Sequence, residues 1–352
     1  MKPTVIDLFA GVGGLSLGFK MAGFDIVLAN ECDKSIATAY KYNHSDTKVI
    51  VADIRNLPID ETFASFCDST TVIIGGPPCQ GFSQKGQRKS IYDERNFLFR
   101  YFVNVVDYVR PRYFVMENVP TLLTTANGYF KKEIIALFGD IGYNLECAIL
   151  NAEDYGVPQN RRRAVIIGKN GESVPAMPEP VDYKVTIWDA ISDLAYLDSG
   201  EGKDCDIYRT EPKSDYQQML RNGSGRLFNH KATKHSELAL ERLRMIPPNR
   251  GKEFLPEEHL TRSIYSGTWT RMKMNETSVT ITTRFDTPSS GKFTHPFLHR
   301  AITVREAARL QSFPDSFRFL GPKSSQMKQV GNAVPPLLAK AIAKVIMNDL
   351  KK

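Results

Sequence analysis

Short hydrophobic runs alternate with amphipathic segments over the first 170 residues of the chain. Runs of strand length lie at Thr4–Phe9, Asp25–Asn30, Val49–Ala52, Thr71–Ile74, Tyr113–Met116, Leu145–Leu150 and Ala164–Ile167. Segments with helical spacing lie at Leu15–Ala22, Lys34–Tyr42, Phe97–Val109 and Gly128–Phe138. This alternation predicts an α/β fold with a mostly parallel sheet and helices on both faces. Ligands of such sheets bind beyond the carboxyl ends of the strands.

The pattern changes where several prolines follow one another, at Pro175, Pro178 and Pro180. From there to about residue 300 the periodicity is poor and turns are frequent, which predicts a second, irregular, β-rich domain. Regular structure resumes at Thr303–Gln311, where Thr303 and Glu306 fit a capping box, and a last helix is expected at Pro336–Leu350. We therefore expect a first domain at 1–178, a second at 179–300 and a C-terminal segment at 301–352.

Charge is distributed unevenly along the chain. The net charge is +7, and residues 207–300 carry 16 basic and 9 acidic side chains while residues 301–352 carry 9 and 3. A basic excess of this kind suits a polyanionic partner, although a solvated basic surface has the same composition. The five cysteines are scattered and no histidine spacing suggests a metal, so we expect no disulfide framework and no metal site. No signal peptide or membrane span is apparent, and we expect a cytoplasmic bacterial protein.

A glycine-rich turn follows the first predicted strand, in Asp7-Leu-Phe-Ala-Gly-Val-Gly-Gly14. Glycines let the backbone turn tightly and approach a ligand, although such a turn can also be purely structural. Glu31 and Asp53 end the second and third strands. A carboxylate there can accept hydrogen bonds from ribose hydroxyls or an adenine amine. The combination favours a nucleotide-type cofactor.

A cysteine follows the fourth predicted strand, in Gly75-Gly-Pro-Pro-Cys79-Gln-Gly-Phe-Ser83. A thiolate is a strong nucleophile, and the two prolines before Cys79 restrict the backbone that carries it. The alternative is a buried structural cysteine, but a polar loop follows directly, and residues 80–96 suit a lid over a phosphate backbone.

Charged residues lie at the ends of two further predicted strands: an acid follows the fifth strand, and two arginines precede the seventh. Glu117 ends the fifth strand, where an acid can exchange a proton with a ring nitrogen. An acid that stands alone is more often an ordinary ion-pair partner. Arg161 and Arg163 lie two residues apart, so in an extended chain they share one face and suit a carbonyl oxygen, a carboxylate or a phosphate. A solvated basic edge is the alternative for this pair.

Together these motifs resemble the DNA (cytosine-5)-methyltransferase family of the bacterial restriction-modification type. The resemblance covers Asp7–Gly14, Glu31, Asp53, Pro77–Ser83, Glu117–Val119, Gln159–Arg163, Arg305–Pro314 and Gly331–Pro336, in the family's order. It implies a Rossmann-like methyltransferase domain with a second, target-recognition domain. It also implies methyl transfer from S-adenosylmethionine to C5 of a cytosine flipped out of duplex DNA.

The resemblance implies a role for each matched residue. Cys79 would attack C6 of cytosine, Glu117 would contact N3 and the exocyclic amine, and Arg161 and Arg163 would hold O2 and the active-site loop. The implied cofactor contacts are Phe9, Gly11, Val12, Gly14, Glu31, Cys32, Asp53, Ile54, Pro78, Leu98, Asn332 and Val334. Cys32 departs from the family pattern, because a bulky aromatic residue often follows the acid and stacks on adenine.

The implied partner is double-stranded DNA, with a cognate restriction endonuclease as a functional partner, and we expect a monomer. Arg271, Arg284 and Lys292 are candidates for DNA contacts in residues 207–300. One alternative is a tRNA cytosine-5 methyltransferase, although the tract after Cys79 is of the DNA type. The other is a non-catalytic DNA-binding relative, which we would expect to lack Cys79, Glu117 or the arginines.

Overall fold

The computed structural model describes residues 2–67, 69–78, 97–261 and 267–352. The chain forms two compact units. The first unit comprises residues 1–155, 162–180 and 336–352, and the second comprises 156–161 and 181–335. In this division, residues 301–335 lie with the second unit and only the last 17 residues return to the first, so these bounds differ from those expected from the sequence.

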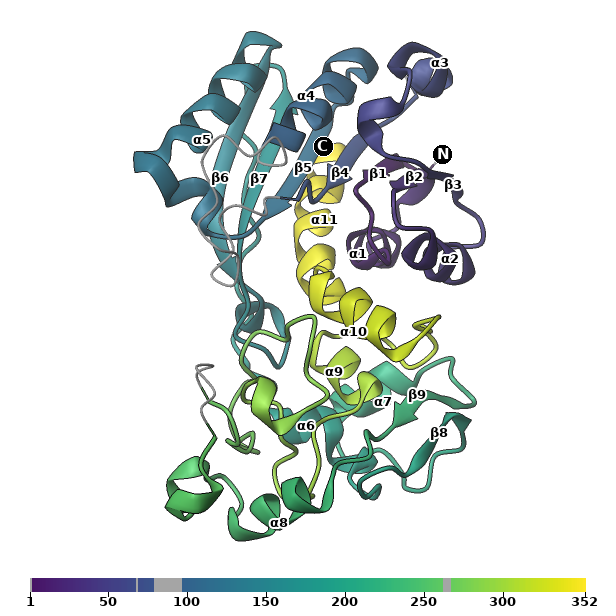
Figure 1. The fold of residues 1–352 in the computed structure, drawn as a ribbon. Coiled ribbons are helices and arrows are strands. Elements are labelled where there is room, and N and C mark those ends of the chain that lie inside the picture. The colour runs from purple at the N-terminus through teal and green to yellow at the C-terminus, as the bar shows by residue number, and fades with distance from the viewer. Residues whose placement is uncertain (1, 68, 79–96, 262–266) are drawn as a thin grey trace. The chain divides into compact units, whose positions relative to one another are not determined.

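A seven-stranded sheet forms the centre of the first unit (Figure 1). Its strands are β1 (Thr4–Leu8), β2 (Asp25–Glu31), β3 (Lys48–Val51), β4 (Val72–Gly75), β5 (Tyr113–Asn118), β6 (Tyr143–Asn151) and β7 (Arg162–Asn170). They lie in the order β3-β2-β1-β4-β5-β7-β6. The first five strands pair in parallel, whereas β7 runs antiparallel to both β5 and β6. The mostly parallel sheet is thus confirmed.

Helices cover the sheet and bury its apolar side chains. The helices of this unit are α1 (Gly14–Met21), α2 (Lys34–Asn43), α3 (Ile59–Phe63), α4 (Leu98–Val109), α5 (Thr121–Asp140) and α11 (Pro336–Leu350). Phenylalanines of α4 and α5 such as Phe102 and Phe138 pack with Ile6 and Leu8 of β1 in one core. Because neighbouring strand residues face opposite sides, Asp7 lies on the other face, where it contacts α1.

Helix α11 packs against α1 although some 300 residues separate them in the chain (Figure 1). Their backbones approach closely at Gly18, where an added Cβ would lie 2.3 Å from the Ala339 Cβ and 2.6 Å from the Lys340 nitrogen. Only glycine fits such an approach. The last helix therefore completes the hydrophobic face of the first one.

The described part of the second unit contains more helix than strand. Its helices are α6 (Ile187–Ile191), α7 (Asp215–Arg221), α8 (Glu237–Met245), α9 (Val304–Leu310) and α10 (Lys323–Asn332), and its strands are β8 (Gly202–Asp206) and β9 (Leu227–Lys231). The β-rich content expected of this unit is not found among its described residues. The predicted capping box is confirmed, because Thr303 and Glu306 exchange hydrogen bonds at the start of α9.

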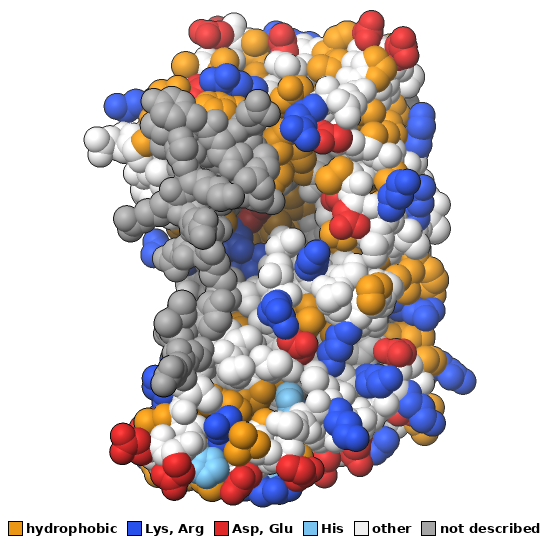
Figure 2. Space-filling model, in the orientation of Figure 1, with side chains coloured by type: hydrophobic (Ala, Val, Ile, Leu, Met, Phe, Trp, Pro, Cys, Tyr) orange, Lys and Arg blue, Asp and Glu red, His pale blue; other side chains and the backbone are white. Residues whose placement is uncertain are grey.

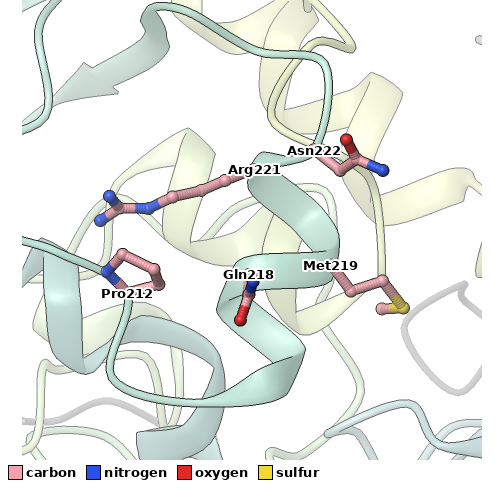
Figure 3. Close-up of a pocket in the computed structure, with 5 residues that line it drawn as sticks. All are labelled: Pro212, Gln218, Met219, Arg221 and Asn222. Atoms are coloured by element: carbon pink, nitrogen blue, oxygen red, sulfur yellow. The ribbon is translucent and has the colours of Figure 1, made fainter.

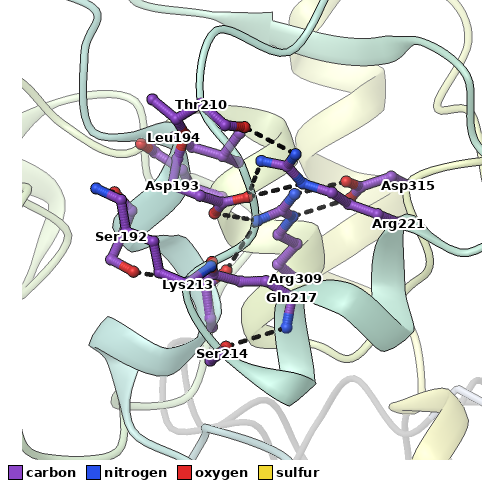
Figure 4. A network of polar contacts seen from close by, with 12 residues as sticks. Ser192, Asp193, Leu194, Thr210, Lys213, Ser214, Gln217, Arg221, Arg309 and Asp315 are labelled. Atoms are coloured by element: carbon purple, nitrogen blue, oxygen red, sulfur yellow. Dashed lines mark hydrogen bonds and ion pairs between the residues drawn. The ribbon is translucent and has the colours of Figure 1, made fainter.

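Buried ion pairs hold the second unit together (Figure 4). The Arg309 guanidinium bonds to Asp315 at 2.6 and 2.9 Å and to Asp193 at 2.5 Å, and all three side chains are fully buried. Arg300 and Glu306 form a second buried pair through two bonds of 2.7 Å. Arg309 also donates to the Ala190 carbonyl of α6, and Arg221 of α7 also pairs with Asp193. Buried charges are tolerated only when they are paired and hydrogen-bonded, so these residues fix the arrangement of α6, α7 and α9.

One helical stretch in the described part of the chain, Lys323–Leu350, is long and apolar enough to cross a membrane by length and composition. About 61% of its most apolar window is buried inside the protein, as in the core helix of a globular protein. The sequence analysis expected the helix at Pro336–Leu350 but not the preceding α10, whose sequence is polar on average. Among the described residues, no cluster of His, Cys, Asp or Glu could hold a metal ion.

Candidate active site

The glycine-rich turn joins the end of β1 to α1 in an unusual backbone conformation. Phe9 has a φ of 56°, which is rare for a residue with a side chain, and Gly11 has a φ of 57°. No described atom lies within 4 Å of a Cβ built on Gly11, so the backbone there is open to a ligand. At Gly13, with a φ of 92°, a Cβ would lie 2.3 Å from the His44 Nε2. The turn thus has one side that a ligand can approach and one that is packed.

Glu31 links this turn to the end of β2. Its Oε2 accepts a hydrogen bond of 2.8 Å from the Gly11 amide, and its Oε1 accepts one of 2.8 Å from the Asp33 amide. Each carboxylate oxygen keeps a second lone pair that can accept a ribose hydroxyl. The carboxylate is therefore oriented and retains the acceptors that the nucleoside part of a cofactor needs.

Cys32 and Asp53 follow the carboxyl ends of β2 and β3, and their side chains are less suited than Glu31 to bind a ligand. Both Asp53 oxygens accept hydrogen bonds from the Arg55 side chain, which lowers the pKa of Asp53. Cys32 is exposed as a residue, but its thiol is partly buried. This partial burial, together with the charge of the neighbouring Glu31, raises the pKa of Cys32. The thiol stays protonated, so Cys32 offers a small neutral surface where the family pattern has an aromatic ring.

A buried polar cluster lies behind the turn. The Asp7 Oδ2 accepts a hydrogen bond of 2.7 Å from the Ser16 hydroxyl, which lies 2.7 Å from the Tyr40 hydroxyl. The Asp7 Oδ1 is buried and has no hydrogen-bond partner among the described residues. Burial raises the pKa of Asp7 to about 7, and the charge of Glu31 adds to the increase. The sequence did not reveal this cluster, because serine and tyrosine at these positions are also ordinary helix residues.

The ends of β4, β5 and β7 bring the polar residues of the chemical motifs together. The Arg163 Nε lies 2.8 Å from the Glu117 Oε1, and both side chains are largely buried. Burial lowers the pKa of Arg163, and the Glu117 carboxylate opposes that decrease. A Cβ on Gly76 would lie 3.1 Å from the Glu117 Oε2, so only a small residue fits beside this carboxylate. The structure therefore pairs Glu117 with Arg163 directly against the strand that leads to Cys79.

Asn118 is a site residue to which the sequence analysis gave no role of its own. Its side-chain amide donates a hydrogen bond of 2.7 Å to the Pro77 carbonyl, and its Oδ1 accepts one of 2.9 Å from the Val119 amide. The backbone before the two prolines is thus tied to the end of β5. Cys79 and the loop at 80–96 lie outside the described residues.

Arg161 makes different contacts from Arg163. Its side chain is 1% exposed, and it donates to the backbone carbonyls of Gly331 and Ala333, both at 2.9 Å, and Ile281 at 3.2 Å. Arg163 is bonded to a carboxylate instead. The two guanidinium groups are thus engaged separately, and the expectation from their spacing that they act together on one face is not met. The reason is that β7 begins only at Arg162, so Arg161 is not part of an extended strand.

The remaining predicted cofactor residues differ in exposure. Val12, Ile54, Leu98 and Val334 are buried, as is Gly14, which begins α1. Pro78 is exposed, and so is Asn332 at the C-terminal end of α10. No ligand contact of these residues is tested by the structure, and their roles stay predictions.

The candidate DNA contacts divide into buried and exposed side chains. Arg271 is buried, and its five donors bond to the carbonyls of Leu243, Ile246, His295 and Leu298 and to the His299 Nδ1. It is therefore a structural residue, and its prediction as a DNA contact is wrong. Arg284 and Lys292 are exposed and stay candidates.

Part of the C-terminal basic excess is thus not available to a polyanion. Besides Arg271, the side chains of Arg300, Arg305 and Arg309 are fully buried. On the face shown in Figure 2, Lys and Arg side chains are interspersed with acidic and uncharged ones. The net charge of a segment consequently overstates the basic surface that it presents.

A shallow hollow of about 420 Å³ lies beside α7 in the second unit (Figure 3). It is lined by Pro212, Gln218, Met219, Arg221 and Asn222. The Arg221 guanidinium is occupied by the buried Asp193, and the other lining groups are neutral. The hollow offers no nucleophile and no acid or base for catalysis.

The sequence model of the family described as C-5 cytosine-specific DNA methylase matches residues 3–348. The chain is 38% identical to Type II methyltransferase M.DdeI of Desulfomicrobium norvegicum, over 97% of this chain and 88% of that protein. It is 39% identical to Type II methyltransferase M1.HphI of Haemophilus parahaemolyticus, over 99% of this chain and 87% of the relative.

The structure is similar to solved structures over its whole length. It matches an Escherichia coli protein titled "putative DNA modification methyltransferase" with a TM-score of 0.81 and 28% identity, covering 100% of both chains. It matches the methyltransferase EhMeth of Entamoeba histolytica with a TM-score of 0.68 and 16% identity, covering 100% of both chains, a likeness of fold alone. On the family match and the two curated relatives, the chain belongs to the C-5 cytosine-specific DNA methylase family and is a DNA (cytosine-5)-methyltransferase.

Proposed function

We propose that this chain methylates C5 of a flipped-out cytosine in a specific sequence of duplex DNA, through a covalent intermediate between Cys79 and C6. The observation that carries this proposal is the buried Glu117–Arg163 pair, at 2.8 Å, against the strand that leads to Cys79. A base inside a duplex is out of reach of such groups, so the target cytosine has to leave the stack.

In the proposed reaction, the Cys79 thiolate adds to C6 of the ring, and the electron pair of the C5–C6 double bond becomes available at C5. S-adenosylmethionine supplies an electrophilic methyl group to C5. Loss of the C5 proton then restores the double bond and expels the Cys79 thiolate. The sulfur–C6 bond of the first step is therefore broken again, a C5–CH₃ bond replaces the C5–H bond, and S-adenosylhomocysteine is left as the other product.

Glu117 and Arg163 have complementary tasks in this proposal. Glu117 would hydrogen-bond N3 and the exocyclic amine and so stabilise the ring as it is attacked. Arg163 would keep the Glu117 carboxylate in place and donate a second hydrogen bond to O2 of the cytosine. Support comes from the geometry of the pair, because Arg163 bonds to Glu117 through Nε and retains further donors on its guanidinium.

The residues at the ends of β1 and β2 suit S-adenosylmethionine. The open backbone at Gly11 and the oriented Glu31 carboxylate fit an adenosine with free ribose hydroxyls. Asn332 and Val334 are further proposed contacts. Asp53 would have to share its carboxylate between Arg55 and the adenine amine, so its contribution to binding is expected to be small.

The proposed partner is double-stranded DNA, and a cognate restriction endonuclease is the proposed functional partner. Several relatives are Type II methyltransferases, the class of enzymes that act in restriction-modification. The exposed Arg284 and Lys292 are proposed to contact DNA. One cytosine is modified at a time, so a monomer would suffice.

Covalent trapping tests the proposal directly. The purified protein is incubated with S-adenosylmethionine and a library of short duplexes in which cytosine is replaced by 5-fluorocytosine. Fluorine at C5 cannot leave as a proton, so the enzyme should stay bound to DNA through Cys79. We expect an adduct that resists denaturation in the parent and is absent from Cys79→Ser.

The outcomes separate the alternatives. Sequencing of the trapped duplexes would identify the target site. An adduct with fluorinated RNA but not with DNA would instead indicate a tRNA enzyme, and no adduct with either would contradict the covalent mechanism. An adduct retained by Cys79→Ser would refute the assignment of the nucleophile. Cys205→Ser, at an exposed cysteine of the second unit, is the matched control and should trap like the parent.

A further inference from the structure

The buried guanidinium of Arg161 binds the backbone on both sides of Asn332. Its Nη2 donates to the carbonyls of Gly331 and Ala333, both at 2.9 Å, and its Nη1 donates to the Ile281 carbonyl at 3.2 Å. These acceptors are 120 to 172 residues away in the sequence. One side chain thus fixes two distant segments of the second unit.

Neighbouring contacts make the same place rigid. The Gln159 side chain accepts a hydrogen bond of 2.9 Å from the Ile281 amide and donates one of 3.0 Å to the Leu310 carbonyl. A Cβ on Gly331 would lie 2.3 Å from the Thr282 carbonyl oxygen, so the two backbones touch. The position of residues 331–334 therefore depends on the segment 159–161 and on the close approach at Gly331.

The environment of Arg161 differs from that of a residue that binds a substrate. The side chain is 1% exposed, and its described hydrogen bonds go to backbone carbonyls of its own unit. A guanidinium keeps its charge when buried, and here main-chain dipoles compensate for lost water. Removing it would leave several buried carbonyls without a donor.

We infer that Arg161 is a positioning residue for the cofactor-binding segment 331–334, and that its main effect is on the affinity for S-adenosylmethionine rather than on the flipped base. The inference rests on the proposed function in that Asn332 and Val334 are proposed cofactor contacts. The two arginines of one short motif would then serve different steps: Arg161 holds the cofactor segment, and Arg163 holds Glu117.

Two matched substitutions distinguish these roles. Arg161→Lys and Arg163→Lys both retain the positive charge but lose the forked geometry. The first measurement is the Kd of S-adenosylhomocysteine for the protein without DNA, by isothermal titration calorimetry. The second is the methyl-transfer rate in a single turnover at saturating cofactor and DNA.

We expect Arg161→Lys to weaken S-adenosylhomocysteine binding by roughly tenfold or more, the loss that follows from one charge-assisted hydrogen bond. The KM for S-adenosylmethionine should rise by a larger factor than kcat falls. Arg163→Lys should leave the Kd within about twofold while the single-turnover rate falls by about two orders of magnitude or more.

A double-substitution cycle tests whether Arg161 acts through Asn332. Asn332→Ala alone should weaken S-adenosylhomocysteine binding, and adding Arg161→Lys should then cost less than it costs in the parent. Fully additive losses would show that Arg161 acts elsewhere. An unchanged Kd in Arg161→Lys combined with a large loss of rate would overturn the inference.

Hydrogen exchange gives a test that needs no variant. In the parent protein, S-adenosylhomocysteine should increase the protection of the amides of residues 331–334. If the ligand binds but exchange there is unchanged, the inference is contradicted while the proposed cofactor stands. If the parent binds no S-adenosylhomocysteine at all, the proposed cofactor is wrong.

Discussion

Replacing Asp7 by asparagine should stabilise the first unit more strongly as the pH rises. The carboxyl is fully buried, one oxygen bonds to Ser16 and the other has no partner among the described residues. Its pKa is raised from 3.8 to about 7, first by burial and then by the charge of Glu31. Between these two values the folded state binds more protons than the unfolded state, so ionisation of Asp7 lowers the free energy of unfolding as the pH rises.

The magnitude follows from the two pKa values. A pKa unit corresponds to about 1.4 kcal/mol, so full ionisation of Asp7 costs about 4 kcal/mol. Integration between pH 5 and pH 8 gives a loss of about 2.5 kcal/mol in the parent that Asp7→Asn does not suffer. The amide places a donor where the free oxygen lies, and this cost is the same at both pH values, so it cancels in the difference.

Urea unfolding at pH 5 and pH 8 and constant ionic strength would measure this difference. Both tryptophans, Trp188 and Trp269, lie in the second unit, so their fluorescence reports that unit, and circular dichroism reports both. The transition seen only by circular dichroism belongs to the first unit. Asp107→Asn, at an exposed aspartate, is the control. If the effect of Asp7→Asn were the same at pH 5 and pH 8, Asp7 would titrate normally and the reasoning would be refuted.

Three further predictions concern packing and buried charge. Gly18→Ala should destabilise the first unit by about 1–3 kcal/mol in thermal unfolding, because the added Cβ would overlap α11. The control is Gly139→Ala, whose Cβ would meet nothing within 4 Å, and it should be neutral or stabilising. Equal effects of the two substitutions would contradict the close approach of α1 and α11. Arg309→Met should lower the stability of the second unit by about 3–5 kcal/mol in urea, because it removes the guanidinium that two buried aspartates share and leaves Asp193 only Arg221, and Asp315 only the more distant Arg305, as cationic partners. A loss no larger than that of the exposed Arg226→Met would argue against the buried pairs. Burial lowers the pKa of His230 to about 3, so the unfolded state binds an extra proton below the ordinary value of 6.5. His230 alone should contribute a fall of about 2 kcal/mol in fluorescence-detected stability between pH 6.5 and pH 5, and the buried His295, whose pKa is also lowered, adds to that fall. His230→Asn should reduce the fall by the share of His230, and an unchanged fall would contradict this assignment.

The first unit could largely be predicted because its strands are short, apolar and separated by amphipathic helices. The strand predicted at Thr4–Phe9 is observed at Thr4–Leu8, one residue shorter. The strand predicted at Asp25–Asn30 is observed at Asp25–Glu31, one residue longer. The antiparallel direction of β7 could not be predicted. Strand direction depends on the connection and on the neighbours in the sheet, and neither leaves a periodic signal in the strand itself.

The second unit could not be predicted in the same way, because buried charges replace a continuous apolar core. Arg271 appeared to be a surface residue from its type alone, yet carbonyls from two distant loops and a histidine surround it. Helix α10 was not expected either, since its sequence is polar on average. Local patterns cannot show which distant backbone groups will accept hydrogen bonds from an arginine.

At the candidate site, motif order predicted roles for Glu117 and Arg163 beside Cys79, and these roles stay predictions. The sequence did not predict the 2.8 Å contact between the two side chains. The sequence could not show that Asn118 holds the Pro77 carbonyl, nor that Arg161 donates to backbone carbonyls of the second unit. Residue type and spacing predict which side chains take part. They do not determine which atoms each side chain contacts.

The pairing of α1 with α11 has a consequence for biosynthesis. Helix α1 ends at Met21, and α11 begins at Pro336, so a ribosome adding about 5–20 residues per second needs roughly 15–60 s to produce the second after the first. During that time the face of α1 around Gly18 lacks its final cover, while the whole second unit can already fold. The first helix to be synthesised would therefore be among the last to be covered, and truncations within α11 would act on the part of the protein that was synthesised first.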